Sequence, residues 1–350
     1  MFFAGVSLAV AAIPEGLPAI VTVALAIGVQ RMVKRNAVIR KLPAVETLGC
    51  ATVICSDKTG TLTQNEMTVV KVYTNEKIFD ITGTGYEPKG QFKIGENTID
   101  LRKSPNLNKL IAIATLCNDA SLDKSPDGYR IVGDPTEGAL ITLGEKASIT
   151  KEDINEKFPR INEIPFDSDR KMMTTFHEGF LEDKFVSFTK GAPDIIINRC
   201  DSILLNGEVI SLTSEIKKDL LSQNTQFSQS ALRVLGFAYR EYDKMPVEIQ
   251  QDLIENNMVF VGLVGMIDPP REEAKEAIKL CKEAGINTYM ITGDYKETAF
   301  AIARELGIAK NEDEAIMGSD LDNLSDEDLK NIVKEKKVYA RVSPEHKVKI

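Results

Sequence analysis

The heptapeptide DKTGTLT, residues 57–63, decides the fold, because it directly follows the apolar run ATVICS at residues 51–56. A short β-branched run ended by an acid and a glycine predicts a buried strand with a carboxylate at its C-terminal end. In open α/β sheets, ligands bind at that end of the strands. Gly60 permits a sharp turn, where threonine hydroxyls and backbone N–H groups can hold phosphate oxygens. An Asp before a Gly is by itself usually only a turn. Placed after this strand, Asp57 is a candidate nucleophile for forming an acyl phosphate.

Length and composition indicate a folded protein of two or more domains. The chain has 350 residues, 43% hydrophobic and 27% charged, which is typical of globular proteins. Its net charge of −9 disfavours nucleic acid as a partner. The five cysteines are odd in number and lack CxxC spacing. This pattern favours a reducing compartment over a disulfide framework or a zinc site.

The N-terminal segment is apolar enough to cross a bilayer. Residues 2–29 contain one ionisable side chain, Glu15, and exceed the length that a membrane helix needs. A signal peptide would have a basic start and a shorter apolar run. Five basic residues against two acidic ones in residues 1–49 predict a cytoplasmic flank just after the segment. We therefore expect a transmembrane helix over residues 1–34, with the chain on the cytoplasmic side from about residue 31.

Two prolines break this predicted helix at PEGLP, residues 14–18. Prolines remove backbone donors and free the carbonyls of Val10, Ala11 and Ile13. Broken backbone at membrane depth is tolerated where it lines an enclosed or watery cavity. Together with the Glu15 carboxylate, these carbonyls would form an oxygen-rich cation site. A kinked helix with a snorkelling glutamate is the alternative.

The C-terminal part alternates cleanly between helices and strands. The pattern predicts helices at 271–284 and 295–306, each stopped by a glycine, and strands at 286–291 and 338–342. Ser343 and Pro344 would start a further helix. Repeated strand–helix–strand units imply a parallel sheet that includes the strand before Asp57. The more mixed pattern between residues 67 and 267 then represents a domain inserted into this sheet.

No Walker loop, GxxxxGK[ST], occurs, so a nucleotide would have to be bound in another way. Thr292 ends a predicted strand, where its hydroxyl can bond a phosphoryl oxygen, and Gly293 and Asp294 shape the loop that follows. Lys347 lies in the first turn of the last predicted helix, where its ammonium can neutralise an aspartyl phosphate. Asp57, Thr292 and Lys347, in this order, resemble the first three motifs of the haloacid-dehalogenase-like phosphotransferase fold.

Position 59 separates two classes of that fold. Phosphatases that this chain resembles carry a second Asp two residues after the nucleophile, as general acid and base. Here the residue is Thr59, so we expect slow hydrolysis and a persistent acyl phosphate. Residues 57–63 match the phosphorylation signature of P-type ATPases at all seven positions. The whole chain resembles this family, most closely the type IIA calcium pumps.

This resemblance implies an α/β fold. It comprises a broken transmembrane helix (1–34), the first part of a haloacid-dehalogenase-like parallel-sheet phosphorylation domain (35–66), an inserted α+β nucleotide-binding domain (67–267) and the second, C-terminally incomplete part of the phosphorylation domain (268–350). We expect a portion of a multi-pass membrane pump. The family's actuator domain, its remaining membrane helices and its last Mg²⁺-site loop are not in this sequence.

The resemblance also assigns site residues. It implies phosphoryl-transfer roles for Asp57, Lys58, Thr59, Thr292 and Lys347, and nucleotide-binding roles for Thr136, Glu137, Phe166, Lys171, Lys190, Gly191, Arg233, Thr292, Gly293, Asp294, Arg341 and Lys347. Asp57 and the Thr59 carbonyl would hold Mg²⁺, and Val10, Ala11, Ile13 and Glu15 the transported cation. Ser168 departs from the family pattern, because animal muscle calcium pumps carry a phosphate-contacting Arg there.

The expected function is that of an ATP-driven cation pump, with Ca²⁺ as the expected ion. Its partners would be ATP, the cation, the lipid bilayer and the rest of its own polypeptide. Two alternatives remain open at this stage. One is a phosphohydrolase of the same fold, which Thr59 and the membrane segment disfavour. The other is a nucleotide-binding fragment without catalysis.

Overall fold

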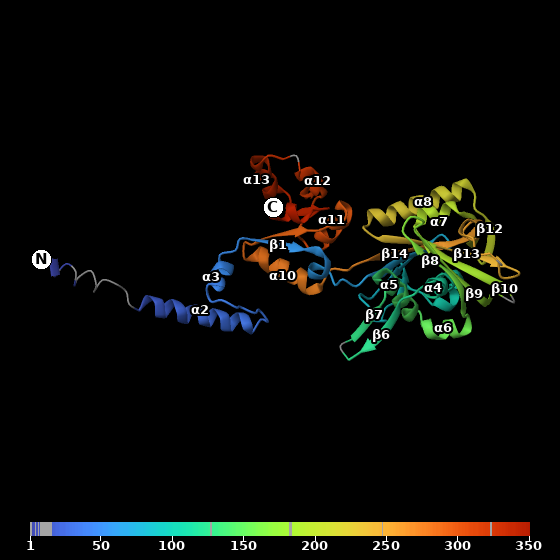
Figure 1. Cartoon of the computed structure of the whole chain (residues 1–350), viewed down its shortest axis with the longest axis horizontal. Coiled ribbons are helices and arrows are strands. Elements are labelled where there is room, and N and C mark those ends of the chain that lie inside the picture. The colour runs from blue at the N-terminus through green and yellow to red at the C-terminus, as the bar shows by residue number, and fades with distance from the viewer. Residues whose placement is uncertain are drawn as a thin grey trace. The chain divides into compact units, whose positions relative to one another are not determined.

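The computed structural model describes residues 2–3, 5, 7, 16–126, 128–181, 184–246, 248–322 and 324–350. The chain divides into two compact units. The first comprises Met1–Cys55 and Leu280–Thr288, and the second comprises Ser56–Lys279 and Tyr289–Ile350. Figure 1 shows the course of the chain.

The first unit contains helices α2 (Leu17–Val33) and α3 (Pro43–Gly49), each with a proline in its first turn. Proline is favoured there because the N–H it lacks would have no helical partner. No helix in the described part of the chain is both long and apolar enough to cross a bilayer. The predicted span over residues 1–34 is therefore not confirmed. Val10, Ala11, Ile13 and Glu15, the predicted cation ligands, lie outside the described residues.

A four-stranded sheet carries the phosphorylation signature. Its strand order is β1-β15-β17-β16, and β17 pairs in parallel with both neighbours that flank it. The strands are β1 (Val53–Asp57), β15 (Asn287–Ile291), β16 (Ala315–Met317) and β17 (Val338–Ala340). The expectation of a buried strand before the heptapeptide was wrong, because most side chains of β1 are exposed. As an edge strand, β1 has a sheet neighbour on one side only.

Helices alternate with these strands. They are α10 (Glu272–Glu283), α11 (Lys296–Glu305), α12 (Gly318–Leu321), α13 (Asp326–Glu335) and α14 (Pro344–Lys349). The sequence predicted α10, α11 and the start of α14, but not α12 or α13. Gly285 and Gly307 follow α10 and α11 with φ angles of 76° and 77°, a left-handed conformation that ends helices and favours glycine. Leu62, Met290 and Ile302 belong to the core between sheet and helices.

The second sheet has eleven strands. Nine of them follow the order β5-β4-β3-β2-β14-β13-β10-β9-β8, and β11 and β12 branch from β14. The strands are β2 (Thr68–Thr74), β3 (Lys77–Ile81), β4 (Phe92–Ile94), β5 (Asn97–Thr98), β8 (Arg160–Asp167), β9 (Met172–Leu181), β10 (Lys184–Gly191), β11 (Cys200–Leu205), β12 (Glu208–Ser211), β13 (Arg233–Tyr242) and β14 (Met258–Ile267). Neighbours along the nine-strand path for which the register is described are antiparallel.

Two hydrophobic cores flank this sheet. Alternation along β13 places Phe237 in one core and Ala238 in the other, as expected for residues that point to opposite faces. The first core includes side chains of α4 (Pro105–Leu116) and α5 (Pro135–Lys146), and the second includes side chains of α7 (Pro193–Asn198) and α8 (Ser214–Gln229). The remaining α-helices and β-strands of the described residues are the hairpin β6 (Ser121–Ser125) and β7 (Gly128–Val132), α6 (Lys151–Lys157) and α9 (Gln251–Ile254).

Two short segments connect the two sheets, and they are bonded to each other. The N–H of Gln64 donates to the carbonyl of Pro269 at 3.0 Å, and the Arg271 Nε donates to the carbonyl of Thr63 at 3.0 Å. The buried Thr63 hydroxyl also donates to Asp268 Oδ2. The segment that leaves the smaller sheet and the segment that returns to it are therefore bonded to each other, and together they form the crossing between the two sheets.

Candidate phosphoryl-transfer and nucleotide site

Asp57 and Lys347 meet at the C-terminal end of β1. The Lys347 ammonium donates to Asp57 Oδ2 at 2.6 Å, and both side chains are about half exposed. Helix α14 positions the lysine. Its first turn holds Pro344, and the Ser343 hydroxyl accepts a hydrogen bond from the N–H of His346. The structure thus brings together a carboxylate that solvent or a ligand can reach and a cation that can neutralise negative charge beside it.

Thr292 lies at the end of the neighbouring strand β15 and is buried. Its backbone is bonded to Tyr339 and Val342 of the β17 segment. Its hydroxyl accepts a hydrogen bond from the N–H of Asp294 at 3.1 Å. The predicted residues Thr292, Gly293 and Asp294 therefore form one bonded turn.

Lys58 forms an ion pair with the loop that follows β15. Its buried ammonium contacts Asp294 Oδ2 at 2.6 Å. This contact ties the turn after β1 to the turn after β15. In the structure Lys58 thus links two loops, and Lys347 is the lysine whose ammonium contacts Asp57.

The turn after Asp57 is shaped by a glycine. Gly60 has a φ of 74°, and Thr63 closes the turn by donating its N–H to the carbonyl of Lys58 at 3.0 Å. Thr59 is exposed within this turn. Its side chain is a hydroxyl where an acid would be needed for general acid–base catalysis.

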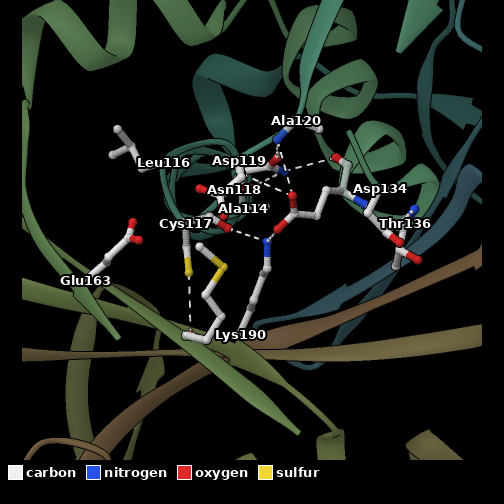
Figure 2. A network of polar contacts seen from close by, with 12 residues as sticks. Ala114, Leu116, Cys117, Asn118, Asp119, Ala120, Asp134, Thr136, Glu163 and Lys190 are labelled. Atoms are coloured by element: carbon white, nitrogen blue, oxygen red, sulfur yellow. Dashed lines mark hydrogen bonds and ion pairs between the residues drawn. The ribbon is translucent and has the colours of Figure 1, made fainter. Parts of the chain in front are cut away.

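Lys190 on strand β10 and Glu137 on helix α5 form an ion pair whose side chains are 7% and 16% exposed. Figure 2 shows Lys190 with its polar neighbours. The Lys190 ammonium contacts Glu137 Oε1 at 2.5 Å and donates to the carbonyl of Cys117 at 2.6 Å. The second carboxylate oxygen, Oε2, accepts from the N–H groups of Asp119 and Ala120, both at 3.2 Å. Within the described residues, both carboxylate oxygens and two of the three ammonium N–H donors therefore have partners, and a partly buried charge is stabilised by such contacts.

Phe166 and Lys171 lie at opposite ends of a tight turn between β8 and β9. Phe166 is 63% exposed, which is unusual for a phenylalanine, and Lys171 is also exposed, with a φ of 55°. Gly191 faces this turn closely, because a Cβ there would lie 2.5 Å from the carbonyl oxygen of Lys171. The exposed ring leaves a flat apolar face accessible to a ligand.

A cleft of about 950 Å³ in the second unit collects many of the predicted residues. Its lining includes Lys58, Thr59, Thr136, Arg233, Gly293, Asp294 and Arg341. It does not include Phe166, Lys171, Lys190 or Gly191. Asp57, Glu137, Thr292 and Lys347 are not in its lining either. The structure thus brings seven of the predicted site residues together in one cleft and leaves the others outside its lining.

The cleft also contains residues that the sequence reasoning missed. Tyr295 stacks against Arg341, whose guanidinium carbon lies 3.9 Å from the ring centroid. Asp134 caps α5 by accepting from the N–H of Thr136 at 2.8 Å. Burial raises the pKa of Asp134, but hydrogen bonds from Thr136 and Glu137 outweigh it and hold this pKa below its usual range. An acid before a proline is a helix-start signal that could have identified Asp134. The Tyr295–Arg341 stack had no local signal.

Comparison with known proteins agrees with this architecture. Residues 106–273 match the family model described as P-type ATPase, cytoplasmic domain N. The chain is 50% identical over 355 residues to calcium-transporting ATPase 1 of Bacillus cereus, and 47% identical over 350 residues to the calcium-transporting ATPase of Bacillus subtilis. It is 40% identical over 354 residues to calcium-transporting ATPase type 2C member 1 of Bos taurus.

These alignments cover all of this chain but only 37%, 39% and 35% of the three relatives, respectively. The chain therefore spans between a third and two fifths of the length of the curated relatives it matches. Its mixed α/β fold, with one parallel sheet and one mainly antiparallel sheet, is consistent with the cytoplasmic domains of such proteins. The chain belongs to the P-type ATPase family. The members to which it is similar here are named as calcium-transporting ATPases.

Proposed function

We propose that the chain is the ATP-using part of an ATP-driven calcium pump that works through an aspartyl phosphate at Asp57. The observation that carries this proposal is the contact between Asp57 and Lys347 at the end of β1. A carboxylate that is half exposed and faced by a cation is suited to nucleophilic attack on a phosphoryl group.

In the proposed step, an Asp57 oxygen attacks the γ-phosphorus of ATP. The new bond joins the carboxylate oxygen to phosphorus, and the bond to the β–γ bridging oxygen breaks, so that ADP leaves. Lys347 stabilises the negative charge on the transferring group. Thr59, in place of an acid, leaves no general base at that position to activate water, so that the acyl phosphate persists.

We propose that the nucleotide contacts two groups of residues. Phe166, Lys171, Lys190, Gly191 and Glu137 would form the base side, where an exposed aromatic ring and buried polar groups are available. Thr136, Arg233, Gly293, Asp294 and Arg341 would face the phosphates from the cleft. One stacked base and a few exposed charges imply weak affinity, with a Kd of about 0.1–1 mM. Phe166→Ala should weaken ATP binding severalfold, and unchanged binding would mean that the base side lies elsewhere.

The residues beside the nucleophile also fit Mg²⁺. Asp57 and the exposed turn at Thr59 offer hard oxygen donors, the type that this ion prefers. We propose that the Asp57 carboxylate and the Thr59 carbonyl would hold it. When bound, the ion would neutralise phosphate charge and orient the phosphoryl group.

We propose that Ca²⁺ is the transported ion, since the similar proteins are named as calcium-transporting ATPases. Val10, Ala11, Ile13 and Glu15 would supply its ligands within a multi-pass membrane protein, with the two sheets on the cytoplasmic side. Phosphorylation of Asp57 in the intact protein should then require Ca²⁺, and Glu15→Gln should weaken that requirement without preventing ATP binding. If Na⁺ or K⁺ triggered phosphorylation instead, the assignment of Ca²⁺ as the transported ion would be wrong, whereas the assignment as a cation pump would stand.

The central test is transfer of label from [γ-³²P]ATP to the intact protein. We expect an acid-stable phosphoenzyme that is absent in Asp57→Asn. A protein that releases phosphate through Asp57 without accumulating label would be a phosphohydrolase of the same fold. A protein that binds ATP but neither labels nor hydrolyses would be a nucleotide-binding module, and either outcome would overturn the pump proposal.

A further inference from the structure

A buried ion pair lies beside the turn that separates Phe166 from Lys171. The side chains of Arg170 and Glu255 are 8% and 0% exposed, and Arg170 Nη1 donates to Glu255 Oε1. Glu255 lies 85 positions further along the chain, directly after α9. A contact between such distant segments fixes the turn to the body of the sheet.

The same arginine holds the turn at its other end. Its Nη2 donates to the carbonyl of Pro165 at 2.5 Å, and its backbone N–H donates to Asp167 Oδ1 at 2.8 Å. Pro165 and Asp167 are the two neighbours of Phe166 in sequence. The Arg170 side chain and backbone therefore tether the chain on both sides of the exposed ring.

Glu255 connects this turn with the strands below it. Its Oε1 also accepts from the Thr174 hydroxyl of β9 at 2.7 Å. That hydroxyl lies 2.9 Å from the hydroxyl of Thr189 on β10, the residue before Lys190. One carboxylate oxygen thus connects the turn after Phe166 with strands β9 and β10. Lys171 directly precedes β9, and Lys190 lies near the end of β10.

The pair is poorly satisfied for a buried contact. Within the part of the chain that the structure describes, Arg170 Nε and Glu255 Oε2 are buried without a hydrogen-bond partner. Buried ion pairs of this kind contribute little net stability compared with apolar residues of similar volume. What the pair does provide is a fixed geometry for the segment around Phe166.

We propose that Arg170 and Glu255 are positioning residues that hold the Phe166 ring in place for the adenine base. This inference rests on the proposed function, because it assumes that Phe166 stacks on a nucleotide. Neither residue touches the nucleotide in this scheme. They affect nucleotide binding only by positioning Phe166. Removing them should therefore weaken ATP binding only when Phe166 is present, whereas a general structural role would not depend on Phe166.

The experiment measures ATP affinity in the full chain by competition against a fluorescent nucleotide. Arg170→Met alone would strand a buried carboxylate and could unfold the protein. The double variant Arg170→Met/Glu255→Leu removes both charges and keeps an apolar interior. We expect it to retain cooperative urea unfolding and to bind ATP roughly fivefold more weakly, the size of one misplaced aromatic contact. Binding of tripolyphosphate, which has no base, should not change.

The same double variant is then made in a Phe166→Ala background, where we expect no further loss of ATP affinity. The matched control is Lys71→Met/Asp80→Leu, which removes an ion pair between β2 and β3 of the same sheet and should leave ATP affinity unchanged. An equal loss in both backgrounds, or no loss in either, would overturn the inference. If Phe166→Ala itself does not change ATP affinity, the proposed base site at Phe166 is wrong. This result is different from the one that would reject only the positioning role of Arg170 and Glu255.

Discussion

The Thr63 hydroxyl donates a hydrogen bond to Asp268 Oδ2 at 2.5 Å, across 205 positions of sequence. Both residues are buried, and they lie on the two segments that connect the sheets. Asp268 Oδ1 accepts a second bond from the N–H of Glu66 at 3.2 Å. The Asp268 carboxylate therefore bonds one segment of the crossing to two residues of the other segment.

Removing this hydroxyl should destabilise the protein. Thr63→Val keeps the side-chain shape but leaves a buried carboxylate oxygen without its donor, which costs about 1–3 kcal/mol. Urea unfolding measures the change in the free energy of unfolding. Thr225→Val, at an exposed threonine whose hydroxyl donates to the carbonyl of Leu221 in its own helix, should change it by less than about 0.5 kcal/mol. Equal effects at the two positions would contradict the role given to the crossing.

Replacing Lys347 by methionine should slow phosphorylation of Asp57. The ammonium that faces the carboxylate is lost, and removal of one such charge-stabilising group lowers the rate about 10²–10³-fold. ATP affinity should change little, because Lys347 does not line the cleft. Single-turnover labelling with [γ-³²P]ATP in the intact protein gives the rate. Lys349→Met on the same helix is the control, and a comparable loss there would argue against a specific contact.

Glu137→Gln should destabilise the protein, although glutamate and glutamine side chains have nearly the same shape. Both oxygens of Glu137 accept hydrogen bonds, one from Lys190 and the other from two backbone N–H groups. An amide has only one oxygen, so one set of donors would face an NH₂ group. We expect a loss of about 1–3 kcal/mol in urea unfolding.

Glu145 on the same helix provides the comparison. Burial, followed by repulsion from Glu152 and Asp153, raises the pKa of Glu145. Its charge is therefore unfavourable in the folded state, and Glu145→Gln should leave stability unchanged or increase it. A loss at position 145 as large as that at position 137 would show that the hydrogen bonds of Glu137 are not the cause.

His177 should make stability depend on pH between about 4 and 6.5. Burial lowers the pKa of His177 to about 4, whereas an unfolded histidine titrates near 6.5. Above pH 6.5 the ring is neutral in both states and contributes no pH dependence. As pH falls from 6.5 to 4, only the unfolded state gains the proton, so the free energy of unfolding decreases, by up to about 3 kcal/mol. Below pH 4 both states are protonated and this effect levels off.

The difference between the wild-type protein and His177→Gln isolates this contribution from that of the carboxylates. The wild-type curve should fall relative to the variant curve between pH 6.5 and pH 4, and the two should run parallel outside this window. Urea unfolding at a series of pH values measures both curves. Parallel curves throughout the window would show that the ring does not titrate as described.

Local patterns were sufficient to predict the elements around the phosphorylation signature. Helices α10 and α11 lie within the predicted ranges 271–284 and 295–306 and end at the predicted glycines. Ser343 caps α14 as expected. These features depend on neighbouring residues, so a single sequence contains them. The exposure of β1 could not be predicted, because it depends on the strand order of the sheet.

The partners of the site residues could not be predicted in the same way. Lys347 lies 290 positions from Asp57, and neither the pairing of Lys58 with Asp294 nor that of Arg170 with Glu255 has a local pattern. The sequence contains 14 phenylalanines, and only the family resemblance singled out Phe166. Contacts between distant segments arise from the packing of the sheets, which periodicity does not specify.

The mutual neutralisation of Lys190 and Glu137 has a consequence for ionic strength. A ligand that approaches this pair meets almost no net charge, so added salt should hardly alter contacts there. Arg233 and Arg341 in the cleft offer positive charge to phosphates, and screening by salt should weaken those contacts. Affinity for adenosine should therefore stay nearly constant as salt rises, while affinity for ATP falls towards it.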